Sequence, residues 1–265
     1  MSLKAILVHL DHSARSVQRL ELAITLANRH QAHLTGYYSS AKPLRILSQG
    51  GFTADDMQEI FRCKTSEADI QAEWIDSAEV DPLGLTLVEK LILHSYYADL
   101  IIVGQLERGK GEAGLPNDFP ERLALLAGRP VLVIPRSGVF TCVGTNVMVA
   151  WRGGRASSRA LYDSIPLLRQ ATKVNLVLVN PLDMSDTEAR NLSSYMIRNQ
   201  IAATCRRVIA TDLSAGNVLL NQACDLGADL LVIGVLSVNR RGKIVVGPAG
   251  RHLLDSMTIP LLISG

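Results

Sequence analysis

The sequence lacks the features that mark several large protein classes. Its four cysteines, Cys63, Cys142, Cys205 and Cys224, form no CxxC pair and are too sparse for a disulfide framework. We therefore expect reduced, structural thiols that behave as small buried apolar groups. No apolar run approaches the ~20 residues that span a bilayer. The net charge of +2 gives no electrostatic reason to expect nucleic acid or a membrane as partner.

Signatures of catalysis and metal binding are also missing. There is no GxGxxG fingerprint, no Walker A loop and no GxSxG nucleophile elbow. His9 and Asp11 would share one strand face, but His12 falls in the following turn and no fourth ligand is evident. We predict no metal site and no catalytic residues, and hence a protein that is not an enzyme.

What the sequence does contain is a series of short apolar runs. Residues 3–10 form the first and are interrupted by His9, so they indicate a first strand and not a signal peptide. Runs such as 230–233 and 259–263 show no alternation with polar residues. Such runs predict strands covered on both faces, as in a parallel sheet.

The expected elements alternate strand and helix throughout. Strands are expected near residues 3–10, 32–39, 71–76, 100–103 and 131–134, then 146–151, 173–180, 206–210, 230–233 and 259–263. Capping residues and apolar periodicity predict helices between them, at about 13–30, 53–70, 81–96, 157–170, 186–204 and 214–227. A short helix is expected after residues 117–118, and a short amphipathic helix before the run at 259–263. Candidate caps are Ser13 or Ser16, Thr53 or Asp55, the Asp81-Pro82 pair, and Asn117 or Asp118.

The two halves repeat this order. ADLIIVG ending at Gly104 matches ADLLVIG ending at Gly234, and 234 minus 104 is 130. Asp11 matches Arg152 at a spacing of 141, so the second half lacks 11 residues, which correspond to the Pro/Gly loop at 41–52. The repeat predicts two tandem domains, 1–138 and 139–265.

Each half is therefore expected to be an α/β doubly wound, five-stranded parallel sheet of Rossmann-like type. Its first strand lies centrally beside its fourth, and the cleft between their carboxyl ends is the switch point where ligands bind. Asp11 and the Gly104 loop would line this cleft in the first half. Arg152 and the Gly234 loop would line it in the second.

The opening ILVHLDHSARSVQRLELAITLA, the two ADL segments and the closing PVLVIP and IPLLIS resemble the universal stress protein family in its tandem two-domain form. The resemblance covers essentially the whole chain. It implies the adenine nucleotide alpha hydrolase-like fold. Members that bind ATP carry the pattern Gly-x2-Gly-x9-Gly-Ser/Thr, and an Asp that contacts adenine at the end of the first strand.

The resemblance places Gly234 at the first glycine of this pattern in the second half. Ser237 stands at the second glycine, Gly247 at the third, and Pro248 at the Ser/Thr position. Arg152 replaces the adenine-contacting Asp. The intervening residues include the basic group Arg240, Arg241 and Lys243, which suits an anion.

In the first half, Gly104 stands at the first glycine and Asp11 at the adenine-contacting position. Glu107 takes the second glycine, and Asn117 and Asp118 take the closing pair. Two like charges about 4 Å apart cost on the order of 4 kcal/mol at an effective dielectric near 20. We therefore expect an acidic mouth that rejects triphosphate in the first half, and a basic mouth in the second.

The sequence thus predicts a cytoplasmic, non-enzymatic stress-response protein in which ATP or AMP binds weakly or not at all. An interaction scaffold without nucleotide is the alternative, and an ATP-hydrolysing or adenylyl-transferring enzyme is a more distant one. The two halves are expected to pair as a pseudo-dimer along their fifth strands, which would otherwise be exposed edges. A homodimer of full chains and an unidentified protein partner stay open.

Overall fold

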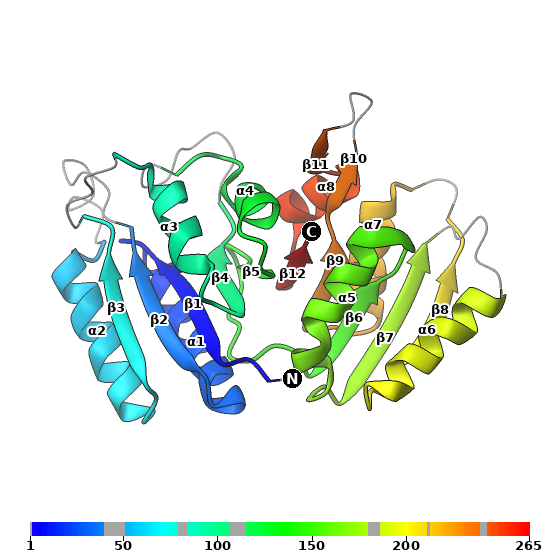
Figure 1. Cartoon of the computed structure of the whole chain (residues 1–265), viewed down its shortest axis with the longest axis horizontal. Helices are drawn as coiled ribbons and strands as arrows, with labels where there is room; N and C mark the ends of the chain where they lie inside the picture. The colour runs from blue at the N-terminus through cyan, green and yellow to red at the C-terminus, as the bar shows by residue number, and fades with distance from the viewer. Residues whose placement is uncertain are drawn as a thin grey trace. The chain divides into compact units, whose positions relative to one another are not determined.

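The computed structural model describes residues 2–39, 51–78, 84–106, 115–179, 186–210, 213–238 and 243–265. These residues form two compact units, Ser2–Cys142 and Val143–Gly265, coloured blue to green and green to red in Figure 1. The boundary expected between residues 138 and 139 lies four residues before this division. The Asp81-Pro82 pair, Glu107, Arg240 and Arg241 fall outside the described residues.

The first unit is one parallel sheet with its helices. The strands are β1 (Ala5–Leu10), β2 (His33–Tyr38), β3 (Ala72–Asp76), β4 (Leu100–Gly104) and β5 (Val131–Ile134). They pair in parallel in the order β3-β2-β1-β4-β5. The helices are α1 (Arg15–His30), α2 (Ala54–Glu67), α3 (Leu87–Ser95) and α4 (Phe119–Leu126).

The second unit repeats this arrangement and adds a hairpin. Its strands β6 (Asn146–Ala150), β7 (Lys173–Val179), β8 (Thr204–Val208), β9 (Leu230–Gly234) and β12 (Leu261–Ser264) pair in parallel in the order β8-β7-β6-β9-β12. Its helices are α5 (Gly154–Leu168), α6 (Asp186–Arg198), α7 (Ala215–Asp225) and α8 (Pro248–Ser256). The antiparallel pair β10 (Leu236–Val238) and β11 (Ile244–Val246) was not foreseen.

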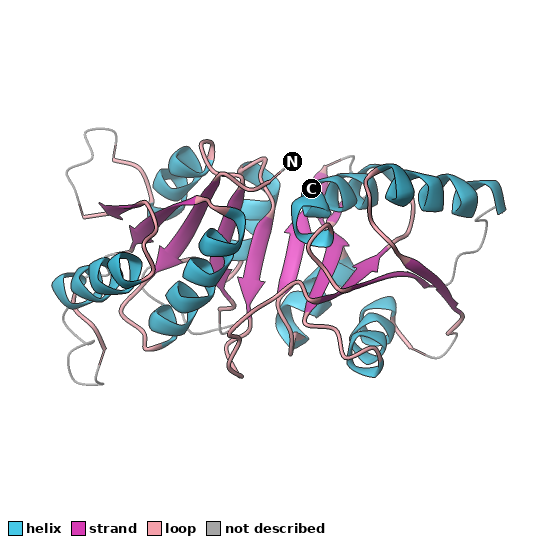
Figure 2. Ribbon diagram, turned by 90° about the horizontal axis from the view of Figure 1, so that it is seen from below, coloured by secondary structure: helices cyan, strands magenta, loops and turns pink. Residues whose placement is uncertain are grey.

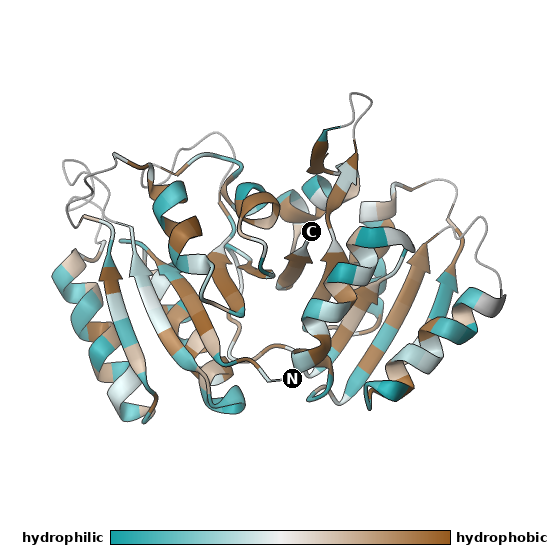
Figure 3. Ribbon diagram, in the orientation of Figure 1, coloured by the Kyte–Doolittle hydropathy of each residue, from teal (hydrophilic) through white to brown (hydrophobic). Residues whose placement is uncertain are grey.

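Helices cover both faces of each sheet, as the view in Figure 2 shows. The central strands are accordingly apolar along most of their length, whereas the outer strand β8 is largely hydrophilic (Figure 3). Five of the six residues of β1 are buried, as are four of the five in β4 and in β9. The doubly wound α/β fold class expected from the unbroken apolar runs is confirmed.

A carboxylate fixes the central strand pair in each unit. Asp99 accepts hydrogen bonds from the backbone N–H groups of Lys4 (2.7 Å) and Ala5 (3.1 Å), at the start of β1. Its repeat partner Asp229 accepts from Gly144 and Thr145, and from Asn146 at the start of β6. The aspartate of each ADL segment therefore holds the start of the fourth strand of its unit beside the start of the first.

Several expected helix ends were wrong. Neither Ser13 nor Ser16 caps α1, whose N-cap is Ala14, because the Ser16 hydroxyl bonds Asp11 instead. Helix α3 begins at Leu87 with Thr86 in a capping box, not at residue 81. The expected start of α4 is confirmed, with Asp118 at its N-cap, although the Asp118 side chain makes no capping bond.

In the second unit, helix α6 stops at Arg198, six residues before the expected end at 204. Gln200 adopts a left-handed conformation (φ 62°) that cannot continue a helix, so β8 begins at Thr204, two residues earlier than expected.

The expectation of buried cysteines was also wrong. All four cysteines are free but exposed. They therefore contribute little to the apolar core, which the strand residues fill. Among the described residues, no helix combines the length and the apolar composition needed to cross a bilayer.

The capping box of α2 gives a testable contribution to stability. Thr53 accepts from Asp56 N–H at 3.1 Å, and Asp56 accepts from Thr53 N–H at 3.0 Å. Replacing Thr53→Ala should lower the free energy of unfolding by about 1 kcal/mol, because the Asp56 N–H loses its acceptor and the Asp56 carboxylate loses the Thr53 hydroxyl. Urea unfolding followed by Trp74 fluorescence measures it, since Trp74 packs on Phe61 of α2 (5.3 Å between ring centroids).

Thr25→Ala is the matched control, because exposed Thr25 lies inside α1 and bonds only Glu21 O. It should be neutral or slightly stabilising, since Ala is the better helix former. Equal losses in both variants would show that the capping box contributes nothing.

Candidate functional site

Each unit has a cavity where its first and fourth strands end, the position expected for a ligand in a doubly wound sheet. The cavity of the first unit has a volume of 310 Å³ and is lined by Asp11, Gly104 and neighbouring side chains. The cavity of the second unit has a volume of 660 Å³, and Arg152 and Gly234 are among its lining residues. The two repeats therefore present openings of unequal size at the same place in the fold.

Two helix N-termini meet at the second cavity. Gly153, the N-cap of α5, lines it together with Arg155 and Ser157 of the first turns. Gly247, the N-cap of α8, lines it from another side, followed by residues 248–250. The first N–H groups of a helix have no acceptor within the helix, and the helix dipole favours negative charge there. This end of the unit is therefore suited to an anion.

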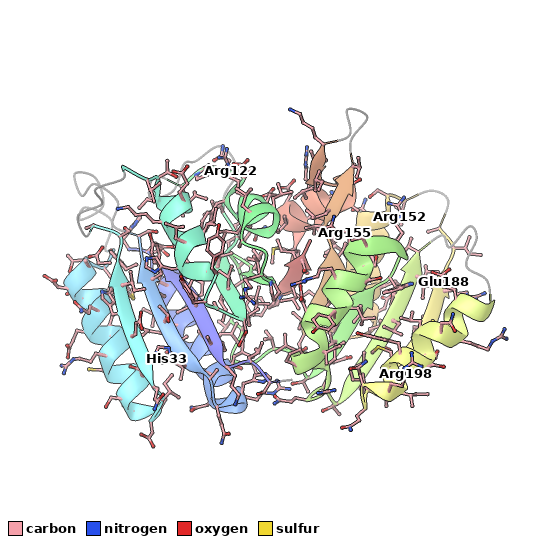
Figure 4. The ribbon with its side chains drawn as sticks, in the orientation of Figure 1. His33, Arg122, Arg152, Arg155, Glu188 and Arg198 are labelled. Atoms are coloured by element: carbon pink, nitrogen blue, oxygen red, sulfur yellow. The ribbon has the colours of Figure 1, made fainter. Side chains whose placement is uncertain are left out.

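Consecutive glycines make the turn into α5. Gly153 (φ 78°, ψ 172°) and Gly154 (φ 77°) both occupy backbone conformations that other residues avoid. The turn brings Arg152 and Arg155 to the start of α5, where Figure 4 labels them. Both side chains are exposed and line the cavity. The described second mouth is basic through Arg152 and Arg155, and Lys243 is not among its lining residues. Glu188 Oε1 lies only 3.2 Å from where a Gly153 Cβ would stand.

Gly234, expected as the first glycine of a phosphate loop, has a packing role. A Cβ at this position would lie 2.7 Å from Ser157 N and would overlap the Ala156 carbonyl group. The first turn of α5 therefore rests directly on the end of β9, and only glycine permits this approach. The pattern of glycines by itself could not distinguish this role from phosphate contact.

The remaining expected residues of the second half gather at the hairpin. Ser237 lies on β10 and Gly247 follows β11, and the Gly247 N–H donates to Val235 O at 2.9 Å. A Gly247 Cβ would lie 3.3 Å from the Ser237 Cβ, so these two positions are neighbours. Pro248 opens α8 and lacks an N–H, which leaves the N–H groups of Ala249 and Gly250 at the cavity.

Trp151 follows β6 and is a lining residue of the second cavity. Its Nε1 is buried with no hydrogen-bond partner in the structure. An unpaired buried donor costs about 1–3 kcal/mol. Together with Val177 and Val179 on β7, it gives one wall of the cavity an apolar surface with a single donor.

In the first unit, Asp11 holds the turn into α1. Its Oδ1 accepts from Ser13 N–H (2.8 Å) and from the Ser16 hydroxyl (3.0 Å), and its Oδ2 accepts from Arg19 Nη2 (2.8 Å). Burial alone would raise the pKa of Asp11, but the Arg19 guanidinium, His9 and the hydrogen bonds from Ser13 together outweigh it, and the pKa lies below its usual range. Both oxygens of the expected adenine contact are therefore already engaged within the protein.

Arg19 is the residue that sequence reasoning missed. It is only 4% exposed, donates through Nε to His9 O (2.6 Å), and would overlap any Cβ placed on Gly104. The guanidinium thus fills the floor of the first cleft. Its position on the buried face of α1, one residue before Leu20, was the available signal, because charged residues on such faces require a partner.

The expected acidic mouth of the first half was wrong for the described residues. Asp118 pairs with Arg122 of its own helix (2.8 Å), is half exposed, and does not line the cavity. The described lining contains three arginines and one carboxylate, that of Asp11. Among the described residues, no cluster of three or more His, Cys, Asp or Glu side chains is placed to hold a metal ion.

The different roles of Gly234 and Gly247 can be separated by substitution. Gly234→Ala should destabilise the second unit by about 1–3 kcal/mol, because α5 must move off β9. Gly247→Ala is the matched change, since its φ of −69° suits any residue and its nearest neighbour lies 3.3 Å away. It should cost less than about 0.5 kcal/mol. Urea unfolding followed by Trp151 fluorescence measures both, and equal costs would contradict the packing role.

Buried His9 predicts a pH-dependent stability. Burial and then the nearby Arg19 charge lower its pKa from 6.5 to about 3. His9 is therefore protonated below about pH 6.5 in the unfolded chain, but only below about pH 3 in the folded chain. Because the unfolded state binds more protons in this range, the free energy of unfolding falls as the pH falls. The slope contributed is up to about 1.4 kcal/mol per pH unit. His30, with a pKa lowered to about 4, adds a term of the same sign.

The measurement uses urea unfolding between pH 4.5 and 7.5 in a Trp151→Phe background, where Trp74 reports on the first unit. His9→Gln can keep the bond that His9 Nε2 makes with Ser39 (2.8 Å) but has no proton to exchange. At pH 5, the slope of the free energy of unfolding against pH should be smaller in His9→Gln than in the parent, by the equivalent of about one bound proton. Identical slopes would exclude His9 as the source.

Comparisons with known proteins bear on the fold. No protein-family model matches the sequence, and no curated protein matches it. A universal stress protein from Archaeoglobus fulgidus is similar in structure, with a TM-score of 0.66 and 17% identity over 98% of this chain and 97% of that one. A universal stress protein from Pseudomonas aeruginosa gives a TM-score of 0.64 at 17% identity over 99% and 93%.

The cytoplasmic domain of a prokaryotic cation chloride cotransporter is also similar, with a TM-score of 0.54, 12% identity, and coverage of 99% of this chain and 95% of that one. Identities this low establish shape and not activity. The solved structures that match nearly the whole chain include several universal stress proteins. The resemblance expected from the sequence is thereby confirmed at the level of structure, and the chain has the fold of the universal stress proteins.

Proposed function

We propose that this chain is a cytoplasmic stress-response protein of the universal stress family, that it is not an enzyme, and that its second unit binds an adenine nucleotide weakly. The observation that carries the proposal is the second cavity. It joins two helix N-termini and two arginines to an apolar wall within 660 Å³. This volume lies in the range typical of small-molecule sites.

The lining divides into a polar side and an apolar side. Phosphate groups would lie near the starts of α5 and α8, where N–H donors converge with Arg152 and Arg155. A planar base would lie against Trp151, Val177 and Val179.

Three features make the binding weak. Pro248 removes one N–H donor from the start of α8. Arg152 has donors only, so it cannot accept from an adenine amino group as an aspartate would. Glu188 brings a carboxylate to the edge of the cavity beside Gly153, where it opposes phosphate. Weak binding suits a sensor of nucleotide level better than a carrier of a permanently bound cofactor.

A protein-interaction scaffold without nucleotide is the second candidate. It is favoured by the first unit, where Arg19 fills the cleft below Gly104. If the second unit were likewise empty of nucleotide in solution, the surfaces and not the cavities would carry the function. Hydrolysis or adenylyl transfer has the least support, because the described lining of the second cavity contains no His, Asp, Glu, Cys or Lys side chain that could act as a base or nucleophile.

Isothermal titration with ATP, ADP and AMP tests nucleotide binding on the full chain. We expect heat with at least one of them. Gly247→Asp should weaken the affinity by about tenfold or more, because it places a carboxylate beside the phosphates. Arg152→Gln should weaken it by about tenfold, the typical worth of one charge-assisted hydrogen bond.

Arg169→Gln is the matched control, because Arg169 is exposed at the opposite end of α5 and donates to Asn199 O (3.0 Å). It should leave the affinity unchanged. Quenching of Trp151 fluorescence, absent in Trp151→Phe, would place the base in the cavity. No heat with any of the three nucleotides would reject the proposal and leave the scaffold function.

A further inference from the structure

We propose that the cavity of the first unit is a separate site for a small divalent oxyanion, of the size of inorganic phosphate. The site shares no residue with the nucleotide cavity of the second unit, so the two proposals stand or fall independently. The argument rests on which charges line this cavity and on what occupies its floor.

Two arginines from different elements converge on the cavity. Arg15 is the first residue of α1, and its Nη1 donates to Gly138 O (2.9 Å) and Gln18 Oε1 (3.1 Å). These bonds orient the guanidinium without neutralising its charge. Arg136 follows β5, and its backbone N–H donates to Gln105 Oε1 (3.1 Å). Among the described residues, no carboxylate forms an ion pair with Arg15 or Arg136.

The carboxylate of the lining is already neutralised. Asp11 and Arg19 are paired at 2.8 Å, with side chains 16% and 5% exposed. Three arginines against one aspartate leave the described lining with a net charge of +2. A dianion would balance this charge, whereas an uncharged ligand would leave two arginines uncompensated. The charge of the described lining therefore favours a dianion.

A helix start points to the same conclusion. The turn into α1 lines the cavity through His12, Ser13 and Arg15. Arg15 opens α1, so the start of that helix also faces the site with its favourable dipole.

The same geometry argues against a nucleoside. The cavity has less than half the volume of the second one, 310 against 660 Å³. Its floor below Gly104 is closed by the Arg19 guanidinium, which is held by His9 O and Asp11. A base would have to displace this buried ion pair, and breaking such a pair costs about 3–5 kcal/mol. A small oxyanion needs only the outer part of the cavity.

Equilibrium dialysis of the full chain against radiolabelled inorganic phosphate, at pH 7.5 and low salt, tests the site. We expect saturable uptake that Arg136→Gln weakens by about tenfold, since it removes one charge-assisted hydrogen bond. Arg136 is exposed and its backbone bond to Gln105 is unaffected, so the variant should fold. Arg15→Gln should weaken the uptake by a similar factor.

Two comparisons make the result specific. Arg62→Gln removes the same charge from the same unit, but its side chain is 74% exposed on α2 and pairs with Glu59, so uptake should be unchanged. Arg152→Gln alters the second cavity, and the Arg136-dependent uptake should persist in it. Saturating adenosine should not displace the phosphate.

Three outcomes would overturn the site. Absence of saturable uptake would exclude it. If Arg62→Gln weakened phosphate uptake as much as Arg136→Gln, the phosphate would be attracted by the net charge of the protein and not by a site. If Arg152→Gln abolished the uptake and Arg136→Gln left it unchanged, the phosphate site would lie in the second unit. None of these depends on whether ATP, ADP or AMP binds.

Discussion

The structure depends on one arrangement that occurs in both units: a carboxylate at the start of the fourth strand that binds the backbone at the start of the first. Asp99 holds Lys4 and Ala5 in this way, and Asp229 holds residues 144–146. The contact fixes β4 beside β1 and β9 beside β6. Because the chain leaves these neighbouring strands in opposite directions across the sheet, their carboxyl ends cannot be bridged, and a cleft opens between them.

The two clefts differ because of a single correlated exchange. Asp11 and Arg19 in the first unit correspond to Arg152 and Ala160 in the second, each 141 residues on. The first unit buries an ion pair that holds the turn into α1 and closes the cleft floor. The second replaces the aspartate-held turn with two glycines and a small buried alanine, so the cavity is larger and its arginine faces outward. One fold therefore carries two sites of different chemistry.

Much of the fold follows from local patterns in the sequence. Runs such as 230–233 are apolar on both sides, which only a sheet covered on both faces accommodates, and the repeat fixes two such sheets. The β10–β11 hairpin was not predicted, because strands of three residues give too short a pattern to detect. The start of α3 was predicted wrongly, because Asp81-Pro82 is as good a local signal for a helix start as Thr86. The cysteines were misjudged because composition does not report which helix face is exposed.

By itself, the sequence determined the fold class, the duplication and the place of the clefts, since these depend on apolar periodicity and on the order of elements along the chain. It also supplied the residues of the second mouth. Only the tertiary structure decided what those residues do. Gly234 packs against α5, Asp11 holds a turn, and Arg19 reaches Gly104 across 85 positions of sequence. These roles are set by distances between elements, and a linear pattern contains no information about which side chain fills the space that two strands leave between them.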